Sequence, residues 1–511
     1  MSMGKINQLK MGVILTYVNM ALGSIIPIFY TPIMLRILGQ EEYGLYSLSN
    51  SVISYLTLLS FGLGGTVVRY IAKYRAEGKK GELEKIAGLA ILMYSFLAIV
   101  VMAGGIFLGN NVETIFHKGL TEAELLKIKP LIWLMAFNTA ISFPISVFSS
   151  IVVAYEKYVY RQFVNIFSTV FAPCANLIAL YLGFGSIGLA VTTTILQFMM
   201  LPMLGGYCVI VLKVKPSFNN LPLHIVKELV GFSLFVFLGS LVDMLFWATD
   251  KVILGMLAGT GIVAVYNVGS QFVSMLTNLS TAFSGVLVPK TTVMVARKAS
   301  KNELTNLFIR VGRLQYIIIA LAISGFILYG KNFIILWAGE KYASAYFVAL
   351  ITMIPLVVPL IQNTGYSILL AENKHKFRSI VYLIIAIVNV ISTYIVVPYL
   401  GAIGAALCSG ISYIIGQGII MNFYYAKVIG LNIPKFWSNI IRMSIVPATM
   451  LIVGMNTKKY IATENWCTLL SQICVYTLLY ILLMYKFSFN EYEKETVKHI
   501  VRKMFMVLEY K

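Results

Sequence analysis

Apolar segments long enough to cross a lipid bilayer recur along this whole sequence. A helix of about twenty apolar residues spans the hydrocarbon layer, and fourteen such segments can be delimited here. They are 11–35, 43–67, 86–109, 130–153, 163–183, 187–212, 228–249, 262–288, 305–329, 345–369, 379–399, 402–426, 439–456 and 466–486. Only 12% of the 511 residues are charged, against about 25% in soluble domains. The sequence therefore predicts an all-α integral membrane protein and excludes a soluble enzyme.

The few residues that bind metals or form disulfides show no suitable pattern. The five cysteines all lie in apolar segments, and no two of them form a C-x-x-C motif. The four histidines are far apart in sequence, and no phosphate-binding Walker A motif occurs. We expect no cofactor, no bound metal and no disulfide framework. The first apolar segment is too long for the core of a signal peptide, so we expect it to remain as a membrane helix.

The distribution of basic residues predicts the orientation in the membrane. With the N-terminus inside and alternating helices, 31 of the 40 lysines and arginines fall on the inner side and nine on the outer side. Cytoplasmic loops of membrane proteins carry such an excess. The net charge of +20 is therefore a topology signal, and nucleic acid is not an expected partner. We predict a multi-pass protein with both termini in the cytoplasm.

An internal repeat underlies this layout. Residues 46–68 and 266–288 share eight identities in 23 positions at an offset of 220. Residues 154–164 share four identities with 371–381 at an offset of 217, and the Gly-x-Ile-Gly pattern at Gly185 recurs at Gly401. Six helices per repeat is an even number, so the repeats run parallel across the membrane. We predict lobes at 1–215 and 216–428 around a central cavity, extra helices at 429–487 and a cytoplasmic amphipathic tail at 488–511.

The tail carries an apolar stripe formed by Val497, Ile500, Val501, Met504 and Leu508. Asn490 and Glu493 have the spacing of a helix cap. The tail is either an anchor to the inner leaflet or a solvated helix, and the sequence favours neither.

Ionisable residues in or near the membrane mark the candidate functional sites, because burying them is costly without a role. Asp243 is the one acid well inside a span. Asp243, Trp247 and Asp250 are spaced to share a helix face. We interpret Asp243 and Asp250 as ion-coupling groups or counter-charges, with a purely structural pairing as the alternative.

Cations near the outer ends of two spans are candidate ligands for an anionic group. Arg36 and Lys251 hold nearly equivalent places in the two repeats. Arginine is especially suited to phosphate, because its guanidinium forms paired hydrogen bonds. The alternative is that both side chains reach the outer interface only to be solvated.

Basic residues at the inner face form a second candidate group, suited to anionic lipid headgroups. The group consists of Arg69, Arg161, Arg378, Arg310 and Arg313. The general excess of basic residues inside also explains them. Two prolines in the first span, Pro27 and Pro32, make it a candidate bending element in gating.

Three segments resemble a known family. Residues 35–78 (LRILGQEEYGLYSLSNSVISYLTLLSFGLGGTVVRYIAKYRAEG) look like the start of bacterial polysaccharide flippases. Residues 249–272 and 333–345 resemble further parts of the same proteins. These are the O-antigen and capsule repeat-unit translocases of the multidrug/oligosaccharidyl-lipid/polysaccharide exporter superfamily.

The resemblance implies two six-helix lobes, two extra C-terminal helices and a V-shaped cavity. It implies that the cargo is an oligosaccharide on undecaprenyl pyrophosphate, moved from the inner to the outer leaflet of the bacterial cytoplasmic membrane by alternating access. It also implies cavity cations that meet the pyrophosphate, which by position are Arg36, Lys251 and Arg69, and it suggests polysaccharide polymerase machinery as a partner.

Other functions remain open. A lipid II or sporulation-type flippase differs only in cargo. A cation-coupled multidrug antiporter would need an acidic cavity, for which only Asp243 is available. A membrane polymerase or ligase would need a large outer loop with paired catalytic residues, and the longest outer loop, 110–129, has none. We therefore expect a transporter and not an enzyme.

Overall fold

The structure is a computed structural model that describes residues 3–60, 62–222, 224–285, 288–458, 460, 465–495 and 498. Every regular element among these residues is a helix. The chain forms two compact units. Unit 1 consists of residues 1–267 and 397–401, and unit 2 of residues 268–396 and 402–511. The units reflect packing and not the sequence repeat, so the lobes at 1–215 and 216–428 and the segments 429–487 and 488–511 stay predictions.

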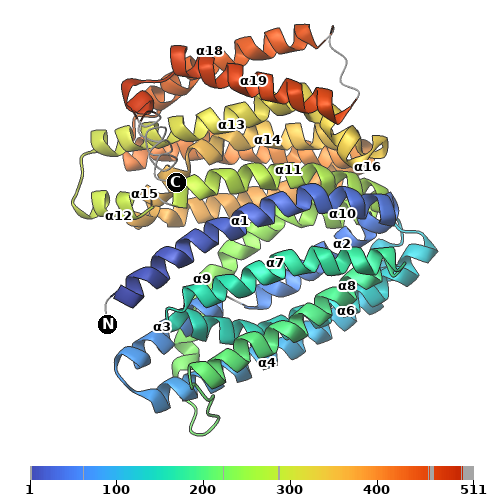
Figure 1. The fold of residues 1–511 in the computed structure, drawn as a ribbon, viewed down its shortest axis with the longest axis vertical. Coiled ribbons are helices and arrows are strands. Elements are labelled where there is room, and N and C mark those ends of the chain that lie inside the picture. Colours follow the sequence, from blue (N-terminus) through green and yellow to red (C-terminus); the bar gives the residue numbers. More distant parts are fainter. Residues whose placement is uncertain are drawn as a thin grey trace, which may run out of the picture. The chain divides into compact units, whose positions relative to one another are not determined.

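Unit 1 contains ten α-helices and the start of an eleventh within the described residues (Figure 1). They are α1 (Met3–Leu38), α2 (Gln40–Thr57), α3 (Leu63–Ala76), α4 (Lys80–Asn110), α5 (Val112–Phe116), α6 (Glu122–Ala154), α7 (Tyr158–Tyr181), α8 (Gly185–Leu201), α9 (His224–Trp247), α10 (Thr249–Leu257) and the first residues of α11 (Thr260–Gly285). A 3₁₀ turn, Leu58–Ser60, joins α2 to α3, and a π-helical segment, Pro202–Val211, continues α8.

Small and polar residues hold the helices of unit 1 together, as expected where lipid removes the hydrophobic driving force. A Cβ atom added to Gly105 of α4 would lie 2.1 Å from the Cβ atom of Ala136 in α6, so the glycine permits this close packing. Helices α1 and α7 lie side by side (Figure 1), and Gln162 of α7 donates a hydrogen bond of 2.8 Å to the Thr16 hydroxyl of α1.

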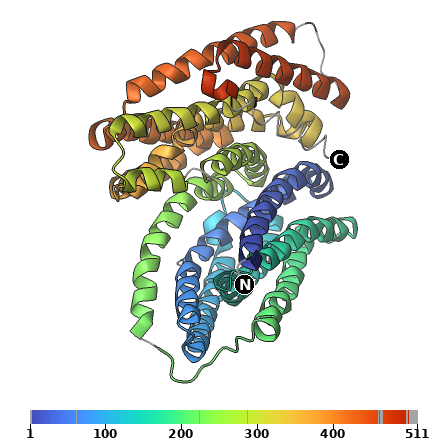
Figure 2. The ribbon, with the colours of Figure 1, turned by 60° about the vertical axis from the view of Figure 1, so that its left-hand side comes forward.

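An extended segment after residue 212 leads to α9 (Figure 2). Glu84 of α4 holds this segment, because its backbone carbonyl accepts a hydrogen bond from the Ser217 amide at 2.9 Å. Gly88, one turn further along α4, leaves room for the Ser217 carbonyl.

Within the described residues, unit 2 contains the rest of α11 and eight further α-helices, of which α17 is a single turn (Figure 2). They are α12 (Val288–Ala296), α13 (Lys301–Ala338), α14 (Ala345–Ile361), α15 (Asn363–Ala371), α16 (His375–Tyr413), α17 (Asn422–Tyr424), α18 (Ile433–Thr457) and α19 (Trp466–Phe487), with π-helical segments at Ile414–Met421 and Tyr425–Ile429. Helices α13, α18 and α19 pack together around the buried Met443, Tyr476, Tyr480 and Met484.

The number of membrane-crossing helices agrees with the sequence. Eleven helical stretches of the described residues are long and apolar enough to span a bilayer. One of them, His375–Ile429, covers two predicted spans, 379–399 and 402–426, and Gly401 between them leaves helical geometry at φ 52°. Two further predicted spans, 228–249 and 262–288, fall on α9 and α11. The prediction of an all-α membrane protein with about fourteen spans is confirmed.

The backbone repeats with the same offsets as the sequence. Helix α2 begins at Gln40 and α11 at Thr260, while α3 ends at Ala76 and α12 at Ala296, so both boundaries keep the register of the first sequence match. Left-handed residues recur in the same way, in the pairs Gly39/Gly259, Gly78/Lys298, Glu156/Asn373, Gly185/Gly401 and Lys213/Gly430. A left-handed backbone costs an L-residue about 1–2 kcal/mol, so its recurrence at non-glycine positions indicates that both halves impose the same turns.

The start of the tail is capped as its sequence indicates. Asn490 accepts a hydrogen bond from the Glu493 amide at 2.9 Å, and Glu493 accepts one from the Asn490 amide at 2.8 Å. The predicted apolar stripe of the tail, 497–508, lies outside the described residues.

Candidate functional site

A pocket of about 400 Å³ lies within unit 1 and contains one of the predicted cations, Lys251. We call it the Lys251 pocket. Its lining residues come from α1, α2, α9, α10 and α11, and are Met34, Tyr43, Tyr46, Ser47, Asn50, Ser51, Ser54, Met244, Trp247, Ala248, Lys251 and Asn267. Among the described residues that line this pocket, Lys251 is the one that carries a charge, and its side chain is half-buried.

Helix α2 supplies a polar wall of the Lys251 pocket. Five of its polar residues recur with spacings of three and four residues and so share one broad helix face, namely Tyr46, Ser47, Asn50, Ser51 and Ser54. We call Tyr46, Ser47, Asn50, Ser51 and Ser54 the α2 stripe. Five polar residues on one face are unusual for a membrane span. Polar residues inside membranes generally face a cavity or a partner.

Close packing and hydrogen bonds fix the α2 stripe in place. The side-chain amide of Asn267 in α11 donates to the Tyr43 hydroxyl at 2.6 Å and to the Ser47 hydroxyl at 2.9 Å. A Cβ atom on Gly44 would lie 1.9 Å from the carbonyl oxygen of Thr260, so only glycine permits this approach of α2 to the start of α11. The Tyr55 hydroxyl is hydrogen-bonded to that of Thr249 in α10.

A second pocket of about 440 Å³ adjoins the first and contains the predicted acid, Asp243. This Asp243 pocket is lined by Thr57, Leu58, Ser60, Gly62, Phe237, Ser240, Asp243, Met244 and Trp247. Met244 and Trp247 line both pockets. The cation Lys251 and the acid Asp243 thus line neighbouring pockets that share Met244 and Trp247.

The structure keeps together two of the three residues that were predicted to share a helix face, Asp243 and Trp247, but not Asp250. Asp243 and Trp247 line the same pocket, but α9 ends at Trp247 and α10 starts at Thr249. Asp250, beyond this break, is fully buried and accepts a hydrogen bond of 2.5 Å from the Tyr266 hydroxyl. Asp250 lines neither pocket, and its coupling role stays a prediction.

The other cations expected at the cavity lie elsewhere in unit 1. Arg36 is an exposed residue in the last turn of α1, where Met34 is the residue that lines the Lys251 pocket. Arg69 is exposed on α3. The structure brings neither residue to the pocket lining. Pro27 and Pro32 lie inside α1, which is helical throughout Met3–Leu38.

Arg161 and Arg378 occupy equivalent positions near the starts of α7 and α16, and both are half-buried. The guanidinium carbon of Arg378 lies 4.0 Å from the ring centre of Tyr366 and 4.1 Å from that of Tyr382. Such cation–π contacts hold the side chain in place.

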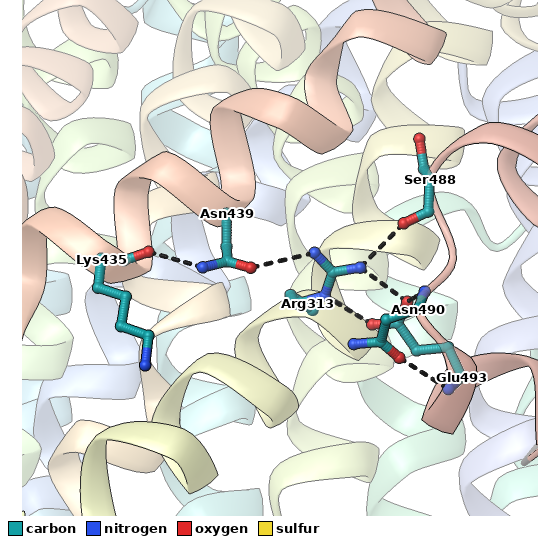
Figure 3. A network of polar contacts seen from close by, with 6 residues as sticks. All are labelled: Arg313, Lys435, Asn439, Ser488, Asn490 and Glu493. Atoms are coloured by element: carbon teal, nitrogen blue, oxygen red, sulfur yellow. Dashed lines mark hydrogen bonds and ion pairs between the residues drawn. The ribbon is translucent and has the colours of Figure 1, made fainter. Parts of the chain in front are cut away.

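Arg313 and Arg310 contact the start of the C-terminal tail, within unit 2. Figure 3 shows the Arg313 guanidinium between Asn439 and the segment from Ser488 to Glu493. It donates to the two Glu493 carboxylate oxygens at 2.7 and 2.8 Å, and to the Ser488 carbonyl at 2.9 Å. The guanidinium carbon of Arg310 lies 3.1 Å from the ring centre of Tyr492. A headgroup role for this pair stays a prediction, and their observed partners belong to the chain itself.

The described residues contain no group of three or more histidines, cysteines or acids placed to hold a metal ion. Among the described residues, those that line the two pockets include the cation Lys251, the acid Asp243 and the indole of Trp247.

Comparison with known families identifies the chain. Residues 9–295 match the model of the family described as "Polysaccharide biosynthesis protein". The chain belongs to the polysaccharide biosynthesis protein family. Its relative, the uncharacterized membrane protein EpsK of Bacillus subtilis (strain 168), is 23% identical over 437 residues, which cover 82% of this chain and 83% of that protein.

Solved structures show the fold of this polysaccharide biosynthesis family member. The lipid II flippase MurJ, in an inward closed conformation, has a TM-score of 0.73 at 17% identity and covers 93% of this chain and 98% of its own. An inward-facing MATE family multidrug resistance transporter of the MOP superfamily has a TM-score of 0.62 at 14% identity, covering 85% and 99%. The chain is a multi-pass membrane protein with the fold of these solved structures, as the sequence predicted.

Sequence reasoning on this family member misses the α2 stripe and Asn267. Serine and asparagine in a span often satisfy themselves on their own backbone, so their presence alone is a weak signal. Their recurrence at helical spacing on one face is the signal that could have revealed the pocket wall.

Proposed function

We propose that this protein is a flippase that moves undecaprenyl-pyrophosphate-linked oligosaccharide repeat units from the inner to the outer leaflet of the bacterial cytoplasmic membrane. Its membership of the polysaccharide biosynthesis family supports a saccharide cargo. Phosphates and sugars cannot cross about 30 Å of hydrocarbon unaided. A polar pocket inside a helical transporter lowers that barrier while the lipid tail stays in the bilayer.

The Lys251 pocket is the observation that carries the proposal. One ammonium group in an otherwise neutral polar lining suits a ligand with an anionic part and many hydroxyl groups. The ammonium supplies the attraction for phosphate, and hydroxyl and amide groups replace the hydration of the remainder.

The expected topology and partners follow from the proposal. Cytoplasmic termini place Arg69, Arg161 and Arg378 at the inner face, where anionic lipids or an incoming pyrophosphate would meet them. Asp243, in the adjoining pocket, is the candidate for ion coupling. Polysaccharide polymerase machinery would receive the cargo at the outer face.

The experiment is a leaflet-exchange assay on purified protein in liposomes. Fluorescently labelled undecaprenyl-pyrophosphate-linked oligosaccharide is added to one leaflet of the liposomes. An impermeant quencher then reports the arrival of the labelled lipid in the other leaflet. Protein-free liposomes are the control. We expect protein-dependent exchange of the glycan lipid; its absence, under conditions where the protein is folded, would contradict the proposal.

Two further arms separate the other transport functions that the sequence left open. Labelled lipid II replaces the oligosaccharide lipid in one arm, and exchange of lipid II alone would identify a lipid II-type flippase. Efflux of ethidium is followed in another arm. Efflux that is lost in Asp243→Asn, with no lipid exchange, would identify a cation antiporter.

A further inference from the structure

Trp247 occupies a special position in unit 1, because its half-buried side chain lines both the Lys251 pocket and the Asp243 pocket. Other tryptophans are engaged: Trp337 packs against Phe272, and Trp437 donates a hydrogen bond to Asn422. Within the part of the chain that the structure describes, Trp247 makes no such hydrogen bond or ring contact. Its indole is therefore available to a ligand in the pockets.

The α2 stripe lines the Lys251 pocket together with this indole. Ser47, Asn50 and Ser54 present hydroxyl and amide groups, and Asn50 is exposed. Part of their hydrogen-bonding capacity is used inside the helix: the Asn50 amide donates to the Tyr46 carbonyl at 3.2 Å, and the Ser54 hydroxyl donates to the Ser51 carbonyl at 2.6 Å. The hydroxyl oxygens and the Asn50 carbonyl oxygen keep acceptor sites.

An apolar ring face beside a row of neutral donors and acceptors matches the two surfaces of a pyranose ring. A sugar ring has a face of C–H groups and an edge of hydroxyl groups. The indole covers the C–H face, as aromatic rings do for flat apolar partners, and the stripe meets the hydroxyl edge. Each pocket, at about 400 and 440 Å³, falls in the range of small-molecule sites.

We infer that Trp247 and the α2 stripe form a subsite for an uncharged sugar ring, next to Lys251, which takes the phosphate. The inference rests on the proposed function and assigns the two parts of the lipid headgroup to different residues. Lys251 recognises the part of the headgroup common to all such lipids. Trp247 and Asn50 recognise the saccharide that distinguishes them.

A purely structural role accounts less well for the stripe. Polar side chains in a span that only satisfy themselves need no common face, whereas these share one and meet a pocket. The duplicated helix α11 keeps polar residues at the equivalent positions of the repeat, with Ser270, Ser274 and Thr277 matching Asn50, Ser54 and Thr57. The polar face is therefore a feature of both repeats.

The test measures binding of two lipids to the purified full-length protein in detergent: undecaprenyl pyrophosphate alone, and the same lipid carrying an N-acetylglucosamine disaccharide. The variants are Trp247→Leu, Trp247→Phe, Asn50→Leu and, as a matched control, Trp466→Leu. Trp466 starts α19 in unit 2 and lines neither pocket. Melting temperatures check that each variant is folded.

We expect Trp247→Leu to weaken binding of the glycosylated lipid about tenfold, corresponding to one lost aromatic contact, and to leave the bare lipid within twofold. Asn50→Leu should act in the same direction, Trp247→Phe should retain part of the affinity, and Trp466→Leu should change neither lipid. Equal losses for both lipids, or no loss for either, would overturn the sugar subsite.

Failure of the proposed function gives a different result. If the wild-type protein binds neither pyrophosphate lipid above a polyprenol without phosphate, the flippase proposal fails and the subsite fails with it. If the wild type binds both lipids equally well, only the sugar subsite is overturned.

Discussion

The guanidinium of Arg313 and the carboxylate of Glu493 form a two-pronged ion pair between residues far apart in the sequence, with N···O distances of 2.7 and 2.8 Å. Arg313 is 7% exposed and Glu493 is 1% exposed. Asn439 of α18 lies 3.4 Å from the same guanidinium, and the Ser488 carbonyl after α19 accepts from it at 2.9 Å (Figure 3). The ion pair therefore joins α13, α18 and the end of α19 to the first turn of the tail.

Loss of one partner should leave a buried charge without compensation. Breaking a buried ion pair in this way typically costs about 3–5 kcal/mol. We expect Glu493→Gln to lower the melting temperature of the detergent-purified protein clearly, and Glu491→Gln, two residues away and 91% exposed on its side chain, to leave it within a degree or two. A double variant, Arg313→Met with Glu493→Met, should recover much of the loss. Equal melting temperatures for Glu493→Gln and Glu491→Gln would refute this role.

The approach of α2 to α11 depends on Gly44. Since a Cβ atom there would lie 1.9 Å from the Thr260 carbonyl oxygen, the two backbones would have to separate. We expect Gly44→Ala to cost about 1–3 kcal/mol, the usual range for overpacking, and to reduce expression of folded protein. Gly65→Ala is the control, because nothing lies within 4 Å of a Cβ at that position and alanine favours the helix. Equal melting temperatures for Gly44→Ala and Gly65→Ala would contradict the prediction.

Stability at acid pH should depend on Glu372, in the turn after α15. Burial opposes ionisation of this carboxylate, but ion pairs with Lys301 at 2.7 Å and Lys374 at 2.8 Å hold the pKa of Glu372 below its usual value. Such a group stabilises the folded state above its unfolded pKa of about 4.3, and the contribution is lost as the pH falls through the lower folded pKa.

We therefore expect the melting temperature of the wild type to fall more steeply than that of Glu372→Gln on acidification below about pH 4.5. Glu113→Gln, at an exposed position of α5, should follow the wild-type curve. Parallel curves for the wild type and Glu372→Gln between pH 3 and 6 would exclude the contribution.

The transport rate should depend on Lys251 but not on Arg36, although the two cations hold equivalent places in the sequence repeat. Lys251 lines the pocket and Arg36 does not. Loss of a charged hydrogen bond costs about 1.5–3 kcal/mol, so Lys251→Gln should slow leaflet exchange about 10- to 100-fold, with Arg36→Gln within twofold of wild type. The reverse order of effects would transfer the phosphate site to Arg36.

The membrane fold and its repeat could be predicted because both depend on local patterns. Span length and hydropathy give the helices directly, and the offsets of the sequence repeat reappear in the left-handed pairs such as Gly185 and Gly401. Glycine adopts this backbone without the cost that other residues pay, so the turn at Gly185 recurs as the same residue at Gly401.

Pairings over long distances could not be predicted in this way. The spacing of Glu493 indicates a helix cap, but its ion pair with Arg313 depends on packing between α13 and the tail. The predicted face of Asp243 and Asp250 assumes one unbroken helix, and the break after Trp247 separates them. The α2 stripe escapes sequence reasoning because two of its serines, Ser51 and Ser54, have ordinary local partners in the carbonyl groups of Ser47 and Ser51.

Photo-cross-linking is the most direct test that the pocket of Lys251 and the α2 stripe holds the headgroup. A photoreactive phenylalanine analogue replaces Asn50 in the stripe, and in a control replaces Phe96, which is 65% exposed on α4 and lines neither pocket. Membranes containing each variant are irradiated with radiolabelled undecaprenyl-pyrophosphate oligosaccharide. We predict an adduct at Asn50 that excess unlabelled lipid suppresses, with none suppressible at Phe96. Suppressible labelling at Phe96 and none at Asn50 would contradict a headgroup site in this pocket.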